Sequence, residues 1–528
     1  MPASLDRDLG LYATITVSLG AMIGSGIFVL PALAAKEAGP SVVLAYLLAG
    51  LVVMPAALSK AEMATAMPEA GGTYLFIDRA MGPLPGTIAG VGAWFSLVFK
   101  SAFAIVGLGA YLLLFVTLSD GVLTVVGLAV AAFLLLVNVV GVKQTGRLQA
   151  LIVTLVLLAL LGFVGDGMTY VEQANYHPFF SHGAGGLFAA TGFVFVSYAG
   201  VTKIASVAEE VEDPGRNIPI GILLSIVVMM VLYTLVAFVV IGIVPIDRLL
   251  AENRLTPMAG AARAFAGPIG EAVIGAVAVL ALTSMANAGI LSSSRFPLAM
   301  SRDSLAPPRL SEVSERFGTP IAAIAVTGVL LLALIAFVDV FQLAKLASAF
   351  QILVFSIVNA ALVAFRESDL DAYDPSFVAP GYPWVQLFGL VGGLALLTQM
   401  GAVAYGGAAG LIVVGLLWYR LYGRERTERE GAALDAIRRR SGESSIDEVR
   451  TRLADDGGGA PATNGEGRGG TVLVALGADD TLAGQSTQLD VATAVAERTD
   501  GSVALVRFEE VPEQVPLSSA AQQDEETF

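Results

Sequence analysis

Long apolar stretches separated by short polar connections dominate the first 420 positions of the chain. A helix needs about 20 mostly apolar residues to cross a bilayer, and twelve stretches reach about that length. The pattern therefore predicts an all-α polytopic membrane protein without a cleaved signal, because residues 1–10 are short and polar. The twelve predicted spans are 11–34, 41–66, 85–117, 121–141, 147–168, 186–208, 218–243, 268–300, 320–339, 341–365, 383–400 and 402–420.

The basic residues between these spans are distributed unequally. An even number of spans places both termini on one side, and cytoplasmic connections carry an excess of Lys and Arg. The pattern therefore predicts that both termini are cytoplasmic. The side of the termini receives Arg7, Lys60, Arg79, Lys143, Arg147, Arg216, Arg295, Arg302, Arg309, Arg316, Arg366 and Arg420, and the other side receives Lys36, Arg248, Arg254 and Arg263.

Composition agrees with a membrane protein and excludes several kinds of chemistry. The chain is 55% hydrophobic and 14% charged, and it has no cysteine, which excludes disulfides, thiol nucleophiles and cysteine-bound metals. Its two histidines, His177 and His182, lie in one polar connection and offer little material for a catalytic dyad or a metal cage. We expect no enzyme activity, no cofactor and no metal, and the net charge of −15 argues against nucleic acid.

The acidity is concentrated after the last span. Residues 421–528 contain 11 Lys or Arg and 21 Asp or Glu, and only six of the chain's 30 basic residues are lysine. An acidic, lysine-poor and arginine-using composition is typical of salt-loving microbes such as the haloarchaea.

Three lysines, Lys100, Lys203 and Lys345, fall inside or at the edges of predicted spans. A charge there costs about 2.5–3.5 kcal/mol on insertion scales, so such residues usually face a cavity. The alternative is a side chain that snorkels to the interface. Snorkelling is favoured for Lys345, which lies near the start of its span, and a cavity is favoured for the other two.

The middle of the first span contains Gly20, Gly24, Ser25 and Gly26. The glycines permit unwinding, which membranes tolerate only where a cavity or a substrate meets the freed backbone groups. The N–H groups from Gly24 to Ile27 would then open a second half-helix and could bind a carboxylate. Close helix packing through Gly20 and Gly24 explains the same residues equally well.

A second interruption about 175 residues later favours unwinding. Ser197, Tyr198, Ala199 and Gly200 lie near the middle of the sixth span. Two broken helices, each opening a set of five spans, are typical of inverted-repeat transporters with a site at the bilayer midplane. The pattern predicts a five-plus-five inverted repeat, leucine-transporter-like, with spans eleven and twelve as an appendage.

Three motifs on these breaks and loops carry a family resemblance over roughly residues 8–420. They are Ile23-Gly24-Ser25-Gly26-Ile27-Phe28, the segment from Glu209 to Pro219 (EEVEDPGRNIP), and Asn287 with Ser294-Arg295 and Ser301-Arg302-Asp303. In this order they resemble the amino acid/polyamine/organocation transporters. The resemblance implies a permease that moves amino acids across the cell membrane by alternating access, coupled to a proton or sodium gradient.

The resemblance also implies where the amino acid binds. Backbone amides at Ile23 to Gly26 would hold the α-carboxylate, carbonyls near Val196, Ser197 and Ala199 the α-ammonium, and side chains of Phe195, Tyr198 and Trp94 the substrate side chain. The implied substrate-binding residues are Ile23, Gly24, Ser25, Gly26, Ile27, Trp94, Phe195, Val196, Ser197, Tyr198, Ala199 and Gly200.

Two departures from the family pattern bear on the substrate and the ion. Transporters of basic amino acids in this family often carry a glutamate where this chain has Thr202, so a strongly basic substrate is not expected. Some proton-coupled relatives carry a lysine in the fifth span, but residues 148–165 of this span contain no ionisable residue. Lys203 could supply a proton-dependent charge instead, or Thr283 and Ser284 could help bind sodium.

Two other functions fit the same pattern. The bundle could be an amino acid sensor that binds without transport and signals through its tail. It could also carry polyamines or other organocations, for which we would expect acidic residues in the broken spans, yet none occurs there before Glu209.

The sequence after Tyr422 predicts two further parts. Residues 1–422 would form the transporter domain, 423–470 a charged helical segment with a flexible linker, and 471–528 a small α/β module. In the module, TVLVALG and SVALVRFEEVP are predicted strands and LDVATAVAERT a predicted helix. This order resembles the first third of universal stress protein domains, without their later glycine-rich phosphate loop, so a regulatory stub without nucleotide is expected.

Overall fold

The computed structural model describes residues 9–67, 72–116, 122–141, 146–205, 208, 211–251, 255–368, 373–427, 431–434, 471–477 and 502–508. They divide into a large unit, which runs to Thr427 and includes 431–434, and a small unit that contains 471–477 and 502–508. Glu209, Glu210 and Lys143 lie outside the described residues, as do the side chains of Arg147 and Thr202.

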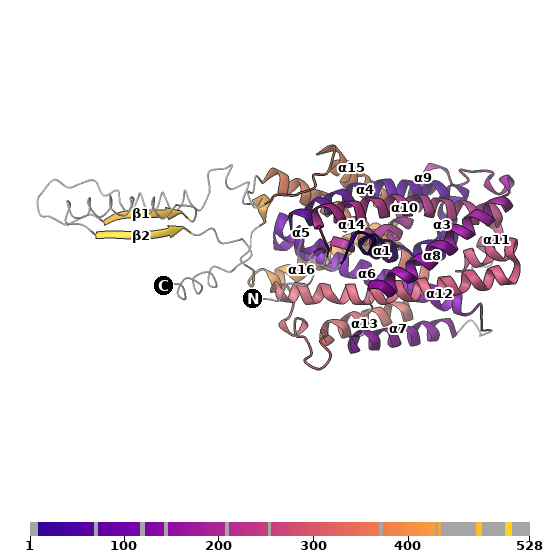
Figure 1. The fold of residues 1–528 in the computed structure, drawn as a ribbon, viewed down its shortest axis with the longest axis horizontal. Helices are drawn as coiled ribbons and strands as arrows, with labels where there is room; N and C mark the ends of the chain where they lie inside the picture. The colour runs from indigo at the N-terminus through magenta and orange to yellow at the C-terminus, as the bar shows by residue number, and fades with distance from the viewer. Residues whose placement is uncertain are drawn as a thin grey trace, which may run out of the picture. The chain divides into compact units, whose positions relative to one another are not determined.

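The large unit consists of helices and their connections (Figure 1). Its α-helices are α1 Leu11–Met22, α2 Ser25–Phe28, α3 Leu30–Ala38, α4 Val42–Ala66, α5 Gly72–Met81, α6 Pro83–Leu112, α7 Val122–Val140, α8 Gly146–Gly167, α9 Gly183–Phe193, α10 Pro214–Ile243, α11 Ile246–Ala251, α12 Pro257–Arg302, α13 Ile321–Phe337, α14 Val340–Glu367, α15 Trp384–Gln399 and α16 Ala402–Trp418. The 3₁₀ segments are η1 Gly39–Ser41, η2 Met168–Tyr170, η3 Gln173–Tyr176, η4 Val194–Thr202 and η6 Pro308–Leu310, and η7 Tyr419–Gly423 is a π-helical turn.

Nine helical segments of the described chain are long and apolar enough to cross a membrane, with Leu30–Ala66 counted as one. Three shorter apolar helices, α1, α13 and α15, accompany them. The longest segment, α12, bends at Gly267, whose φ of 67° is left-handed, so a short helix precedes the span predicted to begin at residue 268. The large unit is therefore a multi-pass membrane protein.

The outer helices expose large apolar side chains. Phe133 of α7, Leu158 of α8, Val329 of α13 and Val391 of α15 are each more than 60% exposed. Apolar surface on this scale is unusual for a protein in water, and a bilayer would cover it. The helices α6 and α14 pack instead against several neighbours each, including one another.

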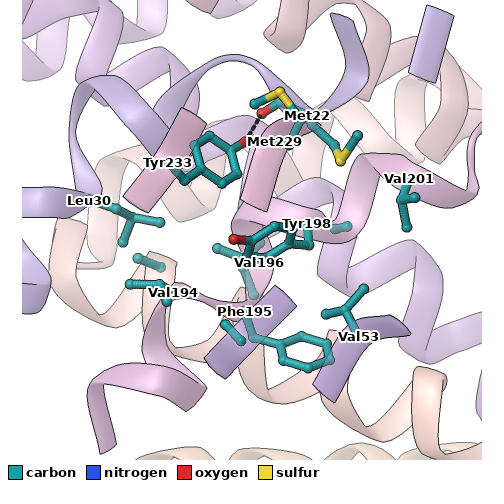
Figure 2. Packing of buried hydrophobic residues seen from close by; sticks show 14 of the residues in the cluster. Met22, Leu30, Val53, Val194, Phe195, Val196, Tyr198, Val201, Met229 and Tyr233 are labelled. Carbon is teal, nitrogen blue, oxygen red and sulfur yellow. Dashed lines mark hydrogen bonds between the residues drawn. The ribbon is translucent and has the colours of Figure 1, made fainter. Parts of the chain in front are cut away.

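Buried side chains of the core pack where α1, α4, η4 and α10 meet. Figure 2 shows Met22, Val53, Phe195, Tyr198 and Tyr233 packed together there, and all five are almost fully buried. The Tyr233 hydroxyl, carried by α10, points at the Met22 carbonyl, where α1 ends. Large aromatic side chains with a polar end can fill a core and still satisfy a backbone group.

The small unit contains two parallel strands, β1 Thr471–Gly477 and β2 Ser502–Phe508, in the segments predicted to be strands. They pair in register from Thr471 with Ser502 to Gly477 with Phe508. Parallel strands need a crossover of a dozen or more residues. The helix predicted between the strands and the linker before β1 lie outside the described residues.

Candidate substrate site

The first span is interrupted where the glycines predict it. The helix α1 ends at Met22 and α2 begins at Ser25, while Ile23 and Gly24 between them are extended. After Val29 the chain continues as α3, so the residues from Ser25 to Ala38 form a nearly continuous second half. The N–H groups at the start of a helix have no acceptor within it.

The backbone carbonyls at the end of α1 accept hydrogen bonds from groups beyond the helix. Leu19 O accepts from the N–H of Ile23, Ala21 O accepts from Lys100 Nζ at 3.2 Å, and Met22 O accepts from the Tyr233 hydroxyl at 2.7 Å. The four carbonyls that end a helix need such partners, above all away from water. Side chains of α6 and α10 therefore satisfy the last backbone carbonyls of α1.

Tyrosine hydroxyls satisfy further carbonyls around the interruption. Tyr46 donates to Gly26 O at 2.7 Å, and Tyr111 donates to Phe28 O at 2.8 Å. Tyr198 donates to Tyr46 O at 2.8 Å, and the Tyr233 hydroxyl also lies 3.1 Å from Ser197 O. Sequence reasoning singled out Tyr198 and missed the other three, although a tyrosine inside an apolar span needs a partner for its hydroxyl.

The sequence predicted an interruption of the sixth span at Ser197 to Gly200, but the span leaves the α-helical form earlier. The helix α9 ends at Phe193 and the chain continues as the nine-residue 3₁₀ segment η4. A 3₁₀ stretch of this length is uncommon and often marks a hinge or a strained sequence. Partners outside the helix support it, since Ser348 Oγ donates to Phe193 O at 2.6 Å and accepts from Val196 N at 3.2 Å.

Glycines bring the two interrupted spans into direct contact, which we call the junction: residues Ala21 to Ile27 and Phe195 to Gly200. A Cβ on Gly200 would lie 2.3 Å from the backbone of Ala21, and one on Gly26 would lie 2.6 Å from Ser197 Oγ. Both distances are shorter than a side chain tolerates. The close packing between the two spans therefore uses Gly26 and Gly200, whereas the pair considered from the sequence, Gly20 and Gly24, faces side chains of α8 and α12.

One N–H at the junction has a weak partner. The backbone N–H of Ser25 donates to Met285 Sδ at 3.2 Å, and the Ser25 hydroxyl lies 3.6 Å from the same atom. A thioether is a poor acceptor. The Met285 sulfur also occupies the space in front of Gly24, where a Cβ would lie 2.0 Å from it.

Other predicted site residues are distributed around the junction. Phe195 is 1% exposed and packs edge-on against Phe355 of α14. Trp94 instead donates its indole N–H to Thr327 of α13 at 3.1 Å. Ile27 is buried within α2.

A small cavity of about 10 Å³ lies beside the end of α1. Gly20 and Ile23 line it together with Gln149 of α8 and Ser284 of α12, and Ser284 Oγ donates to Gln149 Oε1 at 3.1 Å. This is about the space that one water needs. The neighbouring candidate, Thr283, donates to Val279 O of its own helix at 2.7 Å.

Of the lysines within spans, Lys100 reaches the junction most directly. It is 5% exposed and bonds Ala21 O, at the negative end of the α1 dipole. Lys203 lies just beyond η4, where its N–H bonds Gly200 O at 3.0 Å, within electrostatic reach of Lys100 and Arg295. The sequence marked Lys100 as an intramembrane charge but gave no sign of its partner.

Comparison with known proteins decides what this bundle is. A family model described as amino acid permease matches residues 9–420. The chain belongs to the amino acid permease family. Its named relatives are permeases and transporters, so it is a transporter and not an enzyme.

Three relatives of the permease are named for different substrates. It is 29% identical to the branched-chain amino acid permease BcaP of Bacillus subtilis, over 80% of this chain and 95% of that one. It is 28% identical to the methylthioribose transporter of the same organism over the same shares. It is 30% identical to cationic amino acid transporter 2 of Arabidopsis thaliana, over 69% of this chain and 60% of that one.

Two motif residues of the permease outside the junction, Asn287 and Glu212, connect separate elements. Asn138 of α7 donates to Asn287 of α12 at 2.8 Å, and both side chains are buried. Glu212 N donates to Leu9 O at 3.0 Å, which ties the segment before α10 to the start of α1. These contacts join α7 to α12 and the segment before α10 to the start of α1.

Proposed function

We propose that the permease is a secondary active transporter of neutral amino acids that works by alternating access. Twelve spans, in a five-plus-five inverted repeat with two additional spans, would lie in the cell membrane with both termini cytoplasmic. Support comes from the order of the interrupted spans: α1 opens the segment up to α8, and α9 with η4 opens the segment up to α14.

The observation that carries the proposed site is the weak bond between Ser25 N–H and Met285 Sδ. A substrate carboxylate is a far stronger acceptor than a thioether, and the start of α2 is electropositive. We infer that the carboxylate displaces the Met285 side chain and binds the amides from Gly24 to Gly26, since the Ile23 amide, which was expected to join them, already donates to Leu19 O at 2.8 Å. The α-ammonium would bind carbonyls of η4 near Val196, Ser197 and Ala199.

A neutral side chain fits the surroundings of this site. Ile23, Ile27, Phe195 and Tyr198 offer apolar or aromatic surface, and all are buried. Two lysines lie beside the junction, Lys100 at Ala21 O and Lys203 after Gly200, and their charges would repel a cationic substrate. These features support a substrate of the kind carried by the named branched-chain permease rather than by the named cationic transporter.

Coupling to a proton or to sodium rests on different residues. For a proton, Lys100 is the stronger candidate beside Lys203, because its ammonium holds the end of α1 directly. For sodium, the small cavity offers oxygen atoms of Ser284 and Gln149 beside Gly20 and Ile23. Thr283 is the weaker candidate because its hydroxyl is bonded within α12.

The tail would be a separate module. Residues 423–470 would form a charged segment and linker, and 471–528 a partial universal-stress-protein-like α/β module that begins with β1. The parallel pairing of β1 and β2 supports a strand–helix–strand order. The acidic, lysine-poor composition supports a haloarchaeal source.

Uptake of labelled leucine into proteoliposomes tests the transport proposal, with imposed pH or sodium gradients to identify the coupling ion. Counterflow of labelled leucine separates a transporter from a sensor, since a sensor binds without exchange. Uptake of putrescine in place of leucine would favour the organocation carrier. No leucine counterflow under any gradient would contradict transport of neutral amino acids.

Gly24→Ala tests the site itself, combined with Met285→Ala, which removes the sulfur that would lie 2.0 Å from the new methyl group and leaves the Cβ of residue 285 at 3.0 Å. We expect Met285→Ala alone to transport and Gly24→Ala/Met285→Ala to lose at least about tenfold in uptake, because the methyl occupies the carboxylate position. Gly410→Ala on α16, where a Cβ meets nothing within 4 Å, is the control. Normal uptake by the double variant would show that the carboxylate binds elsewhere.

A further inference from the structure

A groove of about 470 Å³ opens on the surface of the bundle, away from the junction. It lies between the first turn of α6 and the end of α16 with the π-helical turn η7. The groove is lined by Leu84, Val413, Leu416, Leu417, Tyr419, Arg420 and Arg424. Among the described residues that line it, two are basic and none is acidic.

Close packing and the π-helical turn build this groove. Gly415 brings α16 against α6, because a Cβ there would lie 2.9 Å from Ile88 Cγ1. In η7 the N–H of Arg424 donates to Tyr419 O at 2.8 Å, which is the wide spacing of a π-turn. Such turns are rare and frequently lie at functional sites. Arg420 and Arg424 thereby line one groove although they are exposed.

Trp418 does not fill the space between them. Its indole N–H donates to Leu305 O at 2.8 Å, and its ring stacks on Tyr422. The end of α16 is thus anchored to the chain after α12, and the groove has a fixed wall.

The groove changes character along its length. Val413, Leu416 and Leu417 are 52%, 41% and 53% exposed, and they belong to the apolar segment Ala402–Gly423 that is long enough to span a membrane. In a bilayer these side chains face acyl chains. Arg420 and Arg424 lie at the last turn of the segment and just beyond it, at the depth of the lipid headgroups.

We propose that this groove binds an anionic phospholipid, with its phosphate between Arg420 and Arg424 and an acyl chain along Val413, Leu416 and Leu417. Two exposed guanidinium groups four residues apart repel each other modestly, and an anion between them would relieve this repulsion. Arginine also matches a phosphate with paired hydrogen bonds. A soluble anion would leave the apolar wall unused, so the occupant is a lipid.

Native mass spectrometry of the purified full chain tests this proposal with added phosphatidylglycerol or phosphatidylcholine. We expect one phosphatidylglycerol to be retained in preference to phosphatidylcholine. Arg420→Gln/Arg424→Gln should weaken that retention roughly tenfold or more, because each arginine donates charge-assisted hydrogen bonds. Equal retention of the two lipids, or no effect of the double variant, would overturn the proposal.

Three further experiments distinguish binding in the groove from general electrostatic attraction of anionic lipid to the protein surface. Leu84→Trp keeps both arginines but fills the groove, and it should lower phosphatidylglycerol retention as well. Arg316→Gln removes an exposed arginine outside the groove and should leave retention unchanged. Competition by inorganic phosphate alone would show a headgroup site without a bound lipid, and a dimer lost on Leu84→Trp would show a second copy in the groove; either result rejects the lipid.

Discussion

The two ends of α14 are held by ion pairs of very different strength. Near its start, Lys345 contacts Glu37 of α3 once, at 3.2 Å, and both side chains are partly exposed at 14% and 26%. Near its end, Arg366 binds Glu62 of α4 through Nε at 2.8 Å and Nη2 at 2.5 Å, and Glu62 is 1% exposed. Glu62 also accepts from the Tyr373 hydroxyl and the Ala379 N–H, at 3.2 and 2.7 Å.

The difference indicates which end can separate more easily. A partly exposed pair contributes little to stability, whereas a buried carboxylate with four donors cannot lose one without a large cost. The end of α14 is therefore fixed to α4 and to the chain before α15, while the start of α14 is held loosely to α3, the second half of the broken span. We expect the side of the bundle at Glu37 to open at a lower cost.

The largest effect should follow from Arg366→Met. This change leaves Glu62 buried without its cation, which typically costs about 3–5 kcal/mol. Thermal unfolding in detergent should show a markedly lower Tm, and Glu62→Gln/Arg366→Met should recover part of the loss because the buried charge is gone. Arg316→Met, at an exposed site, should leave Tm nearly unchanged. A loss as small as that of the control would mean that both ends of α14 are held weakly.

An intermediate effect should follow from Tyr233→Phe, because the Tyr233 hydroxyl contacts Met22 and Ser197 of the junction. The variant leaves the Met22 and Ser197 carbonyls without their shared donor, at a cost of about 1–3 kcal/mol. The same unfolding measurement on Tyr12→Phe provides the control, since Tyr12 is 63% exposed and bonds only Thr154 among its described side-chain contacts. Equal shifts for the two variants would show that the tyrosine contacts do not fix the end of α1.

The smallest effect should follow from Lys345→Gln, at about 0.2–1 kcal/mol. High salt should weaken the Lys345–Glu37 pair in the wild type and leave the buried Glu62–Arg366 pair unchanged. A double-mutant cycle with Glu37→Gln, measured by thermal unfolding at low and high salt, isolates the coupling energy. A coupling energy as large as that of the buried pair, and insensitive to salt, would remove the asymmetry between the two ends.

The sequence predicted the interruption of the first span, because glycines weaken the middle of a helix and a polar residue, Ser25, follows Gly24. It also predicted the apolar segments, whose length is set by the bilayer. The partners of the interruption could not be predicted. Lys100 bonds a carbonyl 79 positions away and Tyr233 one 211 positions away, and only tertiary packing brings them together.

Side-chain direction limited the ion-site prediction in the same way. Ser284 lines the cavity and Thr283 bonds its own helix, because neighbouring residues on a helix point about 100° apart. The 3₁₀ form of η4 is also set from outside, in part by Ser348, which bonds both sides of its start.

The contact at Gly200 has a mechanical consequence for the whole bundle. With no side chain between η4 and the backbone of Ala21, the two interrupted spans have no clearance along the line that joins them. A displacement of either span therefore moves the other, because no side chain between them can change its conformation to accommodate the displacement. A spectroscopic probe on η4 should therefore report displacements of α1, and position 200 should tolerate no residue larger than glycine while that transmission is kept.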